Sequence, residues 1–391
     1  MAITYTSGTL TSVNVNTDSQ IIDMENHIFD LDPQASPFTI FLNKAGKEKA
    51  GNRTVKCLEW RSKEYVIYAP GISAGVVSAT FTITNSAGSA ALFLEPGDIV
   101  FIPSWGTAGD VGGEHLLISE CSSGGTCTFT RAYGAGEAAM ATTTTGALGF
   151  VLADAAAEGA AKRNPLRVKM DTSENYTQII KTLCSLTGTE IAIDHYGTGN
   201  RRKSEQRHMG IEHQKKKERA FLYGKNVTAV VTSRTMKGLR SFLSTNVWGA
   251  TGVTAGTFRN SLGINLIKGC FDHSSSERKV ALCGSYCIDA WDQAASSKLE
   301  LMQNANFYGL KMLNMVVPFG ELVVSYHQQL DPHAIMIVDL KYVKEAYLRA
   351  LTLELDVQTP GTDTKEDQYM EETTLRVKLE ETMGYGYDIS V

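Results

Sequence analysis

The chain has 391 residues, of which 43% are hydrophobic and 20% are charged. This composition is typical of a folded protein, and the length predicts two or three domains. The formal net charge of -5 excludes a protein held on nucleic acid by an overall basic field. No stretch approaches the ~18 uninterrupted apolar residues of a membrane-spanning helix. The first ten residues lack the basic and apolar segments of a secretory signal, so the sequence predicts a protein made in the cytoplasm, with no membrane partner.

The N-terminal region begins with a polar arm in which β-forming residues are frequent. A helix is expected at 19–30, where apolar residues recur near helical spacing. A second helix is expected from the N-cap Ser36, with Pro37 in its first position, to a stop at Gly46. After a basic loop, Val55–Tyr68 is rich in β-formers and is expected as one long strand.

From about residue 72 to 160 the composition changes to Gly, Ala, Thr and Ser, with little charge. Short strands separated by turn residues are expected there, a pattern typical of a small β-barrel or sandwich. These strands are Thr80–Thr84, Asp98–Pro103, His115–Glu120, Thr126–Arg131 and Gly149–Leu152. Pro165–Ile180 then alternates charged and apolar residues. We expect it to pair with Val55–Tyr68 as the second arm of a long hairpin, with the β-domain inserted at the tip.

The longest helix is predicted at 198–223 and is basic. From Arg201 to Arg219 there are eight Lys or Arg against three Glu, an excess of five positive charges. The rest of the chain alternates helices and strands. Helical spacing occurs at 236–243, 258–266, 285–291 and 342–351, and strand patterns occur at 279–283, 322–326, 334–338 and 371–380.

No group of residues predicts a catalytic or metal site. His208 and His213 lie five positions apart on the long helix, about 140° around its axis from each other. They do not match the one-turn spacing of a zinc-binding histidine pair. The sequence contains no phosphate-binding glycine loop and no nucleophile elbow. The expectation is a protein without catalytic residues, metal or cofactor, in which acidic pairs such as Glu371 and Glu372 are surface charge.

Cys121 and Cys127 flank a short turn and could face each other across a hairpin. The seven cysteines are an odd number spread over a long chain, unlike the framework of a small disulfide-rich domain. Reduced packing cysteines are therefore the preferred interpretation, and a disulfide between these two is the alternative.

The basic helix has two interpretations. Clustered cations bind phosphates, and such contact would be to the nucleic-acid backbone, independent of sequence. The alternative is a solvated helix face stabilised by ion pairs, because Glu residues are interspersed. The candidates for contact with DNA are Lys215, Lys216, Lys217 and Arg219.

The order of motifs along nearly the whole chain resembles the major capsid proteins of tailed bacteriophages, in the subfamily with a β-domain inserted in the extended loop. Each motif is degenerate by itself, and their shared order carries the resemblance. The motifs are Asp32-Pro33, Ser36-Pro37-Phe38, Glu59-Trp60, Glu95-Pro96-Gly97-Asp98, Arg131-Ala132-Tyr133-Gly134, Glu218-Arg219-Ala220-Phe221-Leu222-Tyr223-Gly224, Arg234-Thr235-Met236-Lys237-Gly238, Phe319-Gly320-Glu321-Leu322, Val338-Asp339-Leu340 and Glu372-Thr373-Thr374-Leu375.

The resemblance implies an α+β fold, the phage major-capsid fold. Its parts are an N-terminal arm, an extended loop, a peripheral domain with a long spine helix, and an axial domain. Mapped by residue number, they are the arm at 1–54, the extended loop at 55–75 and 161–182, the inserted β-domain at 76–160, the peripheral domain at 183–255 and 350–391, and the axial domain at 256–349. The spine helix is then the basic helix at 198–223.

The function that the resemblance implies is a structural one. The chain is expected to self-assemble into hexamers and pentamers of an icosahedral shell around double-stranded DNA, within the virion, after assembly in the host cytoplasm. Its expected partners are itself, a portal protein, a separate scaffolding protein, a decoration protein and the packaged DNA. Charged and aromatic residues of the extended loop are expected to set the register between subunits. They are Trp60, Arg61, Lys63, Glu64, Arg167, Lys169 and Asp171.

Two alternatives remain at this stage. An encapsulin-like compartment has the same fold and encloses enzymes instead of DNA, so its contents distinguish it. A hydrolase with an unrecognised site is the alternative from a different class.

Overall fold

The computed structural model describes residues 36–60, 65–70, 78–82, 94–103, 113–122, 126–134, 147–156, 158–159, 170–194, 200–227, 233–249, 261–272, 276–296, 303–307, 310–317 and 319–389. Within these ranges the chain is a mixed α+β protein, which confirms the predicted fold class. It divides into two compact units. One, called the body here, comprises Met1–Cys57 and Thr172–Val391; the other, called the inserted domain, comprises Leu58–Asp171. The inserted domain is wider than the insertion expected at 76–160.

The body contains a seven-stranded sheet with the order β11-β19-β16-β12-β15-β14-β13. Its strands are β11 (Val247–Gly249), β12 (Arg278–Cys283), β13 (Gln303–Phe307), β14 (Leu310–Val317), β15 (Gly320–Tyr326), β16 (Ile335–Val338) and β19 (Gly384–Tyr387). Strands β12 and β15 run parallel, whereas β12 and β16 are antiparallel. Alternate residues of β12 enter two different cores: Val280 and Leu282 in one, Ala281 and Cys283 in the other. The sheet is therefore covered on both faces, as the period of two in a strand requires.

Helices supply the other side of each core. The cluster around Leu282 includes residues of α1 (Pro37–Ala45) and α4 (Leu239–Phe242), together with the C-terminal turn of α3 (Arg201–Tyr223). The opposite cluster contains Trp291. It is formed with η2 (Gly263–Ile267, a π-helical turn), α6 (Lys268–Asp272) and α7 (Ser285–Ser296). The short 3₁₀ turn η3 (Glu380–Thr382) leads into β19.

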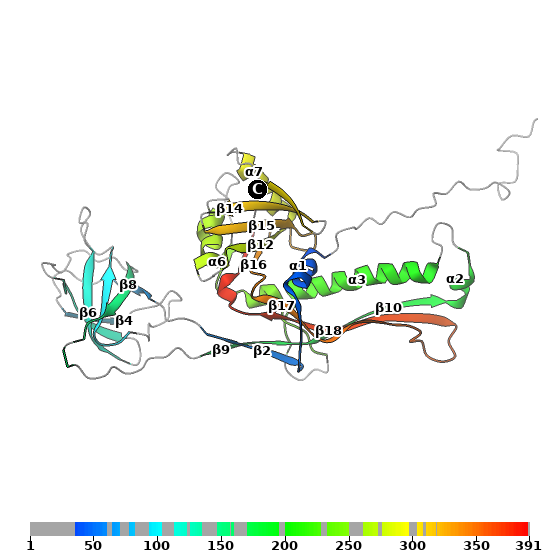
Figure 1. The fold of residues 1–391 in the computed structure, drawn as a ribbon, viewed down its shortest axis with the longest axis horizontal. Helices are drawn as coiled ribbons and strands as arrows, with labels where there is room; N and C mark the ends of the chain where they lie inside the picture. Colours follow the sequence, from blue (N-terminus) through cyan, green and yellow to red (C-terminus); the bar gives the residue numbers. More distant parts are fainter. Residues whose placement is uncertain are drawn as a thin grey trace, which may run out of the picture. The chain divides into compact units, whose positions relative to one another are not determined.

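A second sheet of the body extends away from these cores alongside α3 (Figure 1). Its order is β1-β17-β18-β10. The strands are β1 (Lys47–Lys49), β10 (Gln178–Thr187), β17 (Val343–Glu354) and β18 (Thr364–Val377). The short helix α2 (Gly188–Ala192) follows β10. Helix α3 has 23 residues, about 35 Å of helix, and its N-cap Asn200 accepts a hydrogen bond from the Lys203 backbone.

The base of the predicted hairpin is confirmed, because β2 (Thr54–Glu59) pairs with β9 (Asp171–Tyr176). The predicted single strand Val55–Tyr68 is wrong. Its second half is a separate strand, β3 (Val66–Ala69), which pairs with β8 in the sheet of the inserted domain. The β-forming composition of this segment is real, but the two halves pair in different sheets.

The inserted domain contains a six-stranded antiparallel sheet with the order β3-β8-β5-β6-β7-β4. Its remaining strands are β4 (Ser78–Thr82), β5 (Asp98–Ile102), β6 (Glu114–Cys121), β7 (Thr126–Thr130) and β8 (Ala147–Asp154). These five match the five strands predicted for the domain. Its core includes Ile67, Val100, Leu116 and Phe129, all almost completely buried.

Of the other predicted helices and strands, some are confirmed and one is wrong. The long helix and the helix that begins after Ser36 are confirmed, as are the strands around 279–283, 322–326 and 334–338. The helix expected at 342–351 is wrong, since this segment is strand β17. The helix expected at 19–30 lies outside the described residues.

Candidate functional site

The first turn of α1 is capped by a residue of α3. The N-cap Ser36 makes no side-chain hydrogen bond to the helix. Instead, the carboxylate of Glu218 accepts hydrogen bonds from the backbone N–H of Phe38 (2.7 Å) and Thr39 (2.9 Å), and from the Thr39 hydroxyl. A helix N-terminus presents unpaired N–H groups and partial positive charge. A buried carboxylate there therefore finds both hydrogen-bond donors and a favourable electrostatic environment.

The same carboxylate binds a histidine that follows β15. His327 Nε2 lies 2.8 Å from Glu218 Oε1, and both side chains are fully buried. The backbone N–H of Gln329 donates to His327 Nδ1 at 3.2 Å. Because Nδ1 accepts this hydrogen bond, the ring proton is on Nε2, and the Nε2–H group donates a hydrogen bond to Glu218. Glu218 therefore connects α1, α3 and the seven-stranded sheet.

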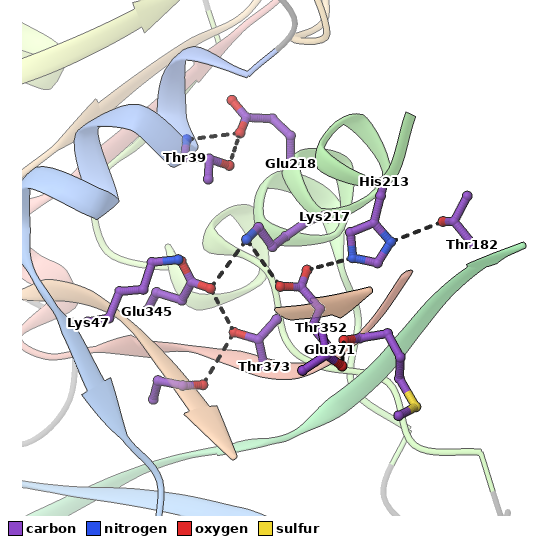
Figure 2. A network of polar contacts seen from close by, with 12 residues as sticks. Thr39, Lys47, Thr182, His213, Lys217, Glu218, Glu345, Thr352, Glu371 and Thr373 are labelled. Carbon is purple, nitrogen blue, oxygen red and sulfur yellow. Dashed lines mark hydrogen bonds and ion pairs between the residues drawn. The ribbon is translucent and has the colours of Figure 1, made fainter. Parts of the chain in front are cut away.

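Lys217, the preceding residue of α3, binds the sheet on which the helix lies (Figure 2). Its ammonium is 3.4 Å from Glu345 of β17 and 3.3 Å from Glu371 of β18, and all three side chains are buried. Lys47 of β1 approaches Glu345 at 3.1 Å, and the Thr373 hydroxyl donates to Glu345 at 3.2 Å. Each buried charge thus has partners of opposite charge, the condition under which buried ions are tolerated.

One turn earlier on α3, His213 lies between β10 and β18. Its Nε2 is 3.2 Å from Glu371, and its Nδ1 is 3.0 Å from the Thr182 hydroxyl. The ammonium of Lys216 donates to the same hydroxyl at 3.2 Å, so Thr182 can donate its own proton to Nδ1. His213 then presents Nε2–H to Glu371. Burial raises the pKa of Glu371, but the hydrogen bond from His213 and the charge of Lys217 outweigh it, so that the net pKa is below its usual value.

Glu372 faces the other side of β18 and is also paired. It accepts hydrogen bonds from Thr177 (2.8 Å), Arg349 (2.9 Å) and Arg234 (3.2 Å). Burial raises the pKa of this carboxyl, but the lowering by these partners is larger, so the net pKa is below its usual value. The prediction that Glu371 and Glu372 are surface charge is therefore wrong. Alternation along a strand does place them on opposite faces, but both faces are covered at this point.

Near its N-terminus, α3 is attached to the sheet by another ionic group. Arg202 makes a bidentate contact with Asp367 of β18, and Gln206 donates to the same carboxylate at 2.8 Å. The hydrogen bond from Arg202 is the main cause that lowers the pKa of Asp367 to about 2. Nη2 of Arg202, one of the two nitrogens that contact Asp367, also donates to Asp356, at 3.0 Å. Polar contacts thus hold the helix on the sheet at Arg202, His213 and Lys217.

These ion pairs join α3 to strands β17 and β18, so they hold the helix on the sheet. Among the described residues, no group of three or more His, Cys, Asp or Glu side chains is arranged to hold a metal ion. The sequence analysis missed the network, although helical spacing contains a signal for it. His213, Lys217 and Phe221 are four residues apart, as are Glu218 and Leu222, so each charged residue shares a face with an apolar one that is buried.

The four cations predicted to face DNA do not lie together. Lys217 is buried and ion-paired, so its prediction as a DNA contact is wrong. Lys216 and Arg219 are exposed, and Lys215 is partly exposed, 3.4 Å from Glu212. Lys203 and Arg207 are also exposed, but they lie at least about 120° around the helix axis from Lys216 and Arg219. The structure thus separates the basic helix into an inward, paired side and an outward, basic side.

Of the residues expected to set register in the extended loop, Trp60 and Asp171 lie within the described residues. The Trp60 side chain follows β2 and is 70% exposed, as is that of Leu58. Asp171 begins β9 and is exposed. The remaining five lie outside the described residues: Arg61, Lys63, Glu64, Arg167 and Lys169.

Cys121 and Cys127 form a disulfide bond, so the preferred interpretation of reduced cysteines does not describe this structure. The two residues are directly opposite each other where β6 and β7 pair. The five other cysteines form no disulfide bond in this structure. Sequence spacing alone had left both states open, because the pairing register decides whether two cysteines can meet.

A long helix fixed by buried ions to an extended sheet, a two-core body and a separate inserted domain are the features of a structural protein. No helix in the described ranges is both long and apolar enough to cross a membrane. A sequence model of the SU10 major capsid protein family matches residues 3–390. The chain belongs to this family and is a major capsid protein of a tailed phage.

Three solved structures that align with this chain are remote from it in sequence. The capsid of Myoviridae phage XM1 is 6% identical, with a TM-score of 0.45, over 97% of this chain and 99% of that one. A capsid chain of cyanophage A-1(L) is 13% identical, with a TM-score of 0.44, over 61% and 85%. The SrpI encapsulin of Synechococcus elongatus is 9% identical, with a TM-score of 0.42, over 56% and 76%. No curated protein sequence matches the chain.

Proposed function

We propose that copies of this chain assemble as hexamers and pentamers into an icosahedral shell that encloses double-stranded DNA. The observation that supports this most directly is the family match over residues 3–390. In the proposed arrangement, the N-terminal arm at 1–54 and the extended loop at 55–75 and 161–182 overlap neighbouring subunits. The peripheral domain comprises 183–255 and 350–391, and the axial domain comprises 256–349.

The exposed aromatic residue at the base of the loop supports the proposed overlap. Trp60 is 70% exposed and follows a strand whose alternate residues, Val55 and Cys57, are buried. Tryptophan is enriched at the buried centres of protein interfaces and is rarely left in water without a partner. A neighbouring subunit that covers Trp60 and Leu58 would remove this apolar surface from water.

Particle formation tests the proposal. The chain is produced alone and with its candidate scaffolding protein, and its products are examined by sedimentation velocity and negative-stain electron microscopy. Closed shells, or capsomers that convert to shells, are expected. Persistence of a monomer or dimer under both conditions would contradict the proposal. DNA inside virion-derived particles, in place of an enzyme cargo, distinguishes a phage head from the encapsulin-like alternative.

The outward side of α3 is proposed to contact packaged DNA through phosphates. Lys216 and Arg219 are exposed there, and neither forms an ion pair within the described part of the chain. Contact through such cations is independent of base sequence and weakens as salt rises. Replacement of Lys216 and Arg219 by Gln should reduce the salt dependence of DNA binding to opened shells. Lys268→Gln, at an exposed position of α6, is the comparison, because it removes a surface charge that is not on α3.

Further partners are proposed on the basis of the function. A portal protein, a separate scaffolding protein and a decoration protein complete the expected set, and the assembly compartment is the host cytoplasm. The inserted domain is proposed as the outer platform for decoration. Replacement of residues 61–169 by a short linker, which removes all six strands of the inserted domain, tests this: intact shells that no longer bind a decoration protein are expected, and loss of shells would show a lateral role instead.

A further inference from the structure

The sheet β1-β17-β18-β10 has one face toward α3 and one face away from it. On β10, Thr182 is on the α3 side, because its hydroxyl contacts His213 and Lys216. Successive residues of a strand point to opposite faces, so the neighbours of Thr182 lie on the face away from α3, which is called the open face here. Its members on β10 are all exposed, and they are Ile179, Lys181, Leu183 and Ser185.

One end of the open face is basic. Two carboxylates lie there, and each contacts two cations: Glu48 binds Lys344 and Arg376, and Glu372 binds Arg234 and Arg349. Lys181 is opposite Met370, whose sulfur lies 3.7 Å from Arg349, and it forms no ion pair within the described residues. Five cations against two carboxylates leave an excess of three positive charges at this end.

The other end of the open face is acidic. Glu366 is opposite Ser185 and accepts a hydrogen bond from the serine hydroxyl at 3.2 Å. Glu354 is opposite Gln368 and accepts a hydrogen bond from its amide at 3.2 Å. Both carboxylates thus have neutral partners, and neither forms an ion pair within the described part of the chain. The open face therefore carries opposite charge at its two ends.

The same face presents apolar side chains between its charges. Ile179 is 44% exposed and Leu183 is 55% exposed, and neither belongs to a hydrophobic cluster of the described residues. These side chains contribute to stability only when another surface removes them from water.

The charges indicate which surface that is. A uniformly charged partner such as DNA would be attracted by one end of the open face and repelled by the other. The same face of a second copy, turned end for end, matches both ends at once. Such self-complementarity is the property of a two-fold contact between identical chains.

We propose that the open face packs on the open face of a second copy of this chain, with the basic end of each copy on the acidic end of the other. The charges set the direction of the contact, since complementary charges select partner and orientation more than they add affinity. Ile179 and Leu183 supply the apolar area that becomes buried. Lys181 of one copy then lies beside Glu354 or Glu366 of the other. This inference rests on the proposed self-assembly and adds a defined contact to it.

Zero-length crosslinking of assembled particles tests the contact. A carbodiimide joins a lysine amine and a carboxylate as an amide only where the two groups touch. Particles are assembled from a mixture of normal and nitrogen-15-labelled chains, treated, and digested for mass spectrometry. The exposed pair Lys56 and Glu174, 3.2 Å apart in one chain, is the internal control for crosslinking within a chain.

The expected product is a peptide that joins Lys181 to Glu354 or Glu366 and contains one normal and one labelled half. Absence of this peptide while the control crosslink forms would overturn the proposal. A crosslink from Lys181 to a carboxylate in residues 1–35 of the same chain would also overturn it, because the arm of the chain itself would then cover the open face.

Charge reversal gives a second measurement. Lys181→Glu should lower the yield of particles at least tenfold, while thermal unfolding of the subunit stays close to wild type because this side chain is exposed. Lys203→Glu, at an exposed position of α3, makes the same change of charge away from the open face and should assemble normally. Normal particles from Lys181→Glu, or equal losses from both variants, would refute this contact without affecting the proposed function. Failure of the wild-type chain to assemble would contradict that function and this contact with it.

Discussion

Glu218 and Thr39 are separated by 179 positions in the sequence, yet the backbone and hydroxyl of Thr39 both donate to the Glu218 carboxylate. This relationship places the start of α1 against the long helix. It also replaces the local N-cap, since the Ser36 side chain makes no such bond. The orientation of the segment that follows residue 36 is therefore set by α3 and not by its own cap.

Glu218→Ala should lower the free energy of unfolding by about 3 kcal/mol. It removes the acceptor for two backbone N–H groups and leaves the buried His327 Nε2 without its partner, and each buried unpaired group costs about 1–3 kcal/mol. Glu212→Ala, at an exposed position of the same helix, should change stability by about 0.5 kcal/mol or less. Denaturant unfolding of the unassembled subunit measures both, and equal losses would contradict the capping role.

Lys217→Met should destabilise the subunit by about 3–5 kcal/mol, because it removes the buried cation that Glu345 and Glu371 share and leaves them only Lys47 and His213 as partners. Arg219→Met, two positions away and exposed, is the control and should have little effect. The double variant Lys217→Met/Glu371→Gln removes the negative charge of one of the two carboxylates and should recover part of the loss. Absence of any recovery would mean that the lysine acts through packing and not through charge.

Acid should weaken the attachment of α3 at Asp367. The folded-state pKa of this carboxyl is lowered to about 2, whereas its usual value is about 3.8. A lowered pKa means that the stabilisation is fully present above the unfolded value and is lost as pH falls from about 4 to about 2. Asp367→Asn should be less stable than wild type at pH 7, and the difference should shrink over this window by up to ~1.4 kcal/mol per pH unit. A constant difference from pH 5 to pH 2 would refute the assignment.

Reduction of the disulfide between Cys121 and Cys127 should destabilise the inserted domain. The closed loop is short, so the chain-entropy estimate is about 2 kcal/mol. Peptide mapping with and without reductant should show the two cysteine peptides joined only in the oxidised sample. Thermal unfolding of a Cys121→Ser/Cys127→Ser variant should show no response to reductant, whereas the wild-type protein should unfold at lower temperature when reduced.

The elements with local signals were predictable from the sequence. Helix α3 has a polar N-terminus, a long run of good helix formers and a stop at Gly224, and all three are visible in the residues. The stop has a packing reason as well. A Cβ at Gly224 would lie 2.5 Å from the Ala220 oxygen and 2.7 Å from the Met236 oxygen, so the returning chain requires a glycine there.

Other elements depend on contacts between distant segments, and local patterns failed there. The segment from Val343 onward contains Lys, Glu, Ala, Leu and Arg, which favour a helix, yet it pairs with β18 over its length. Tertiary pairing outweighs such propensities, which amount to a few tenths of a kcal/mol per residue. The roles of Lys217 and Glu218 were hidden for the same reason, because their partners come from β17, β18, α1 and the segment after β15.

The pairing of β2 with β9 has a consequence for how this protein can vary. The chain leaves the body and returns to it on neighbouring strands, joined by an ion pair of 3.2 Å between Lys56 and Glu174 and by a hydrogen bond from Thr177 to Arg53. A segment whose two ends are held side by side behaves as a cassette. Evolution can exchange such a cassette, and an engineer can replace it with a foreign domain of similar end spacing, while the ionic network around Lys217 and Glu218 is left intact.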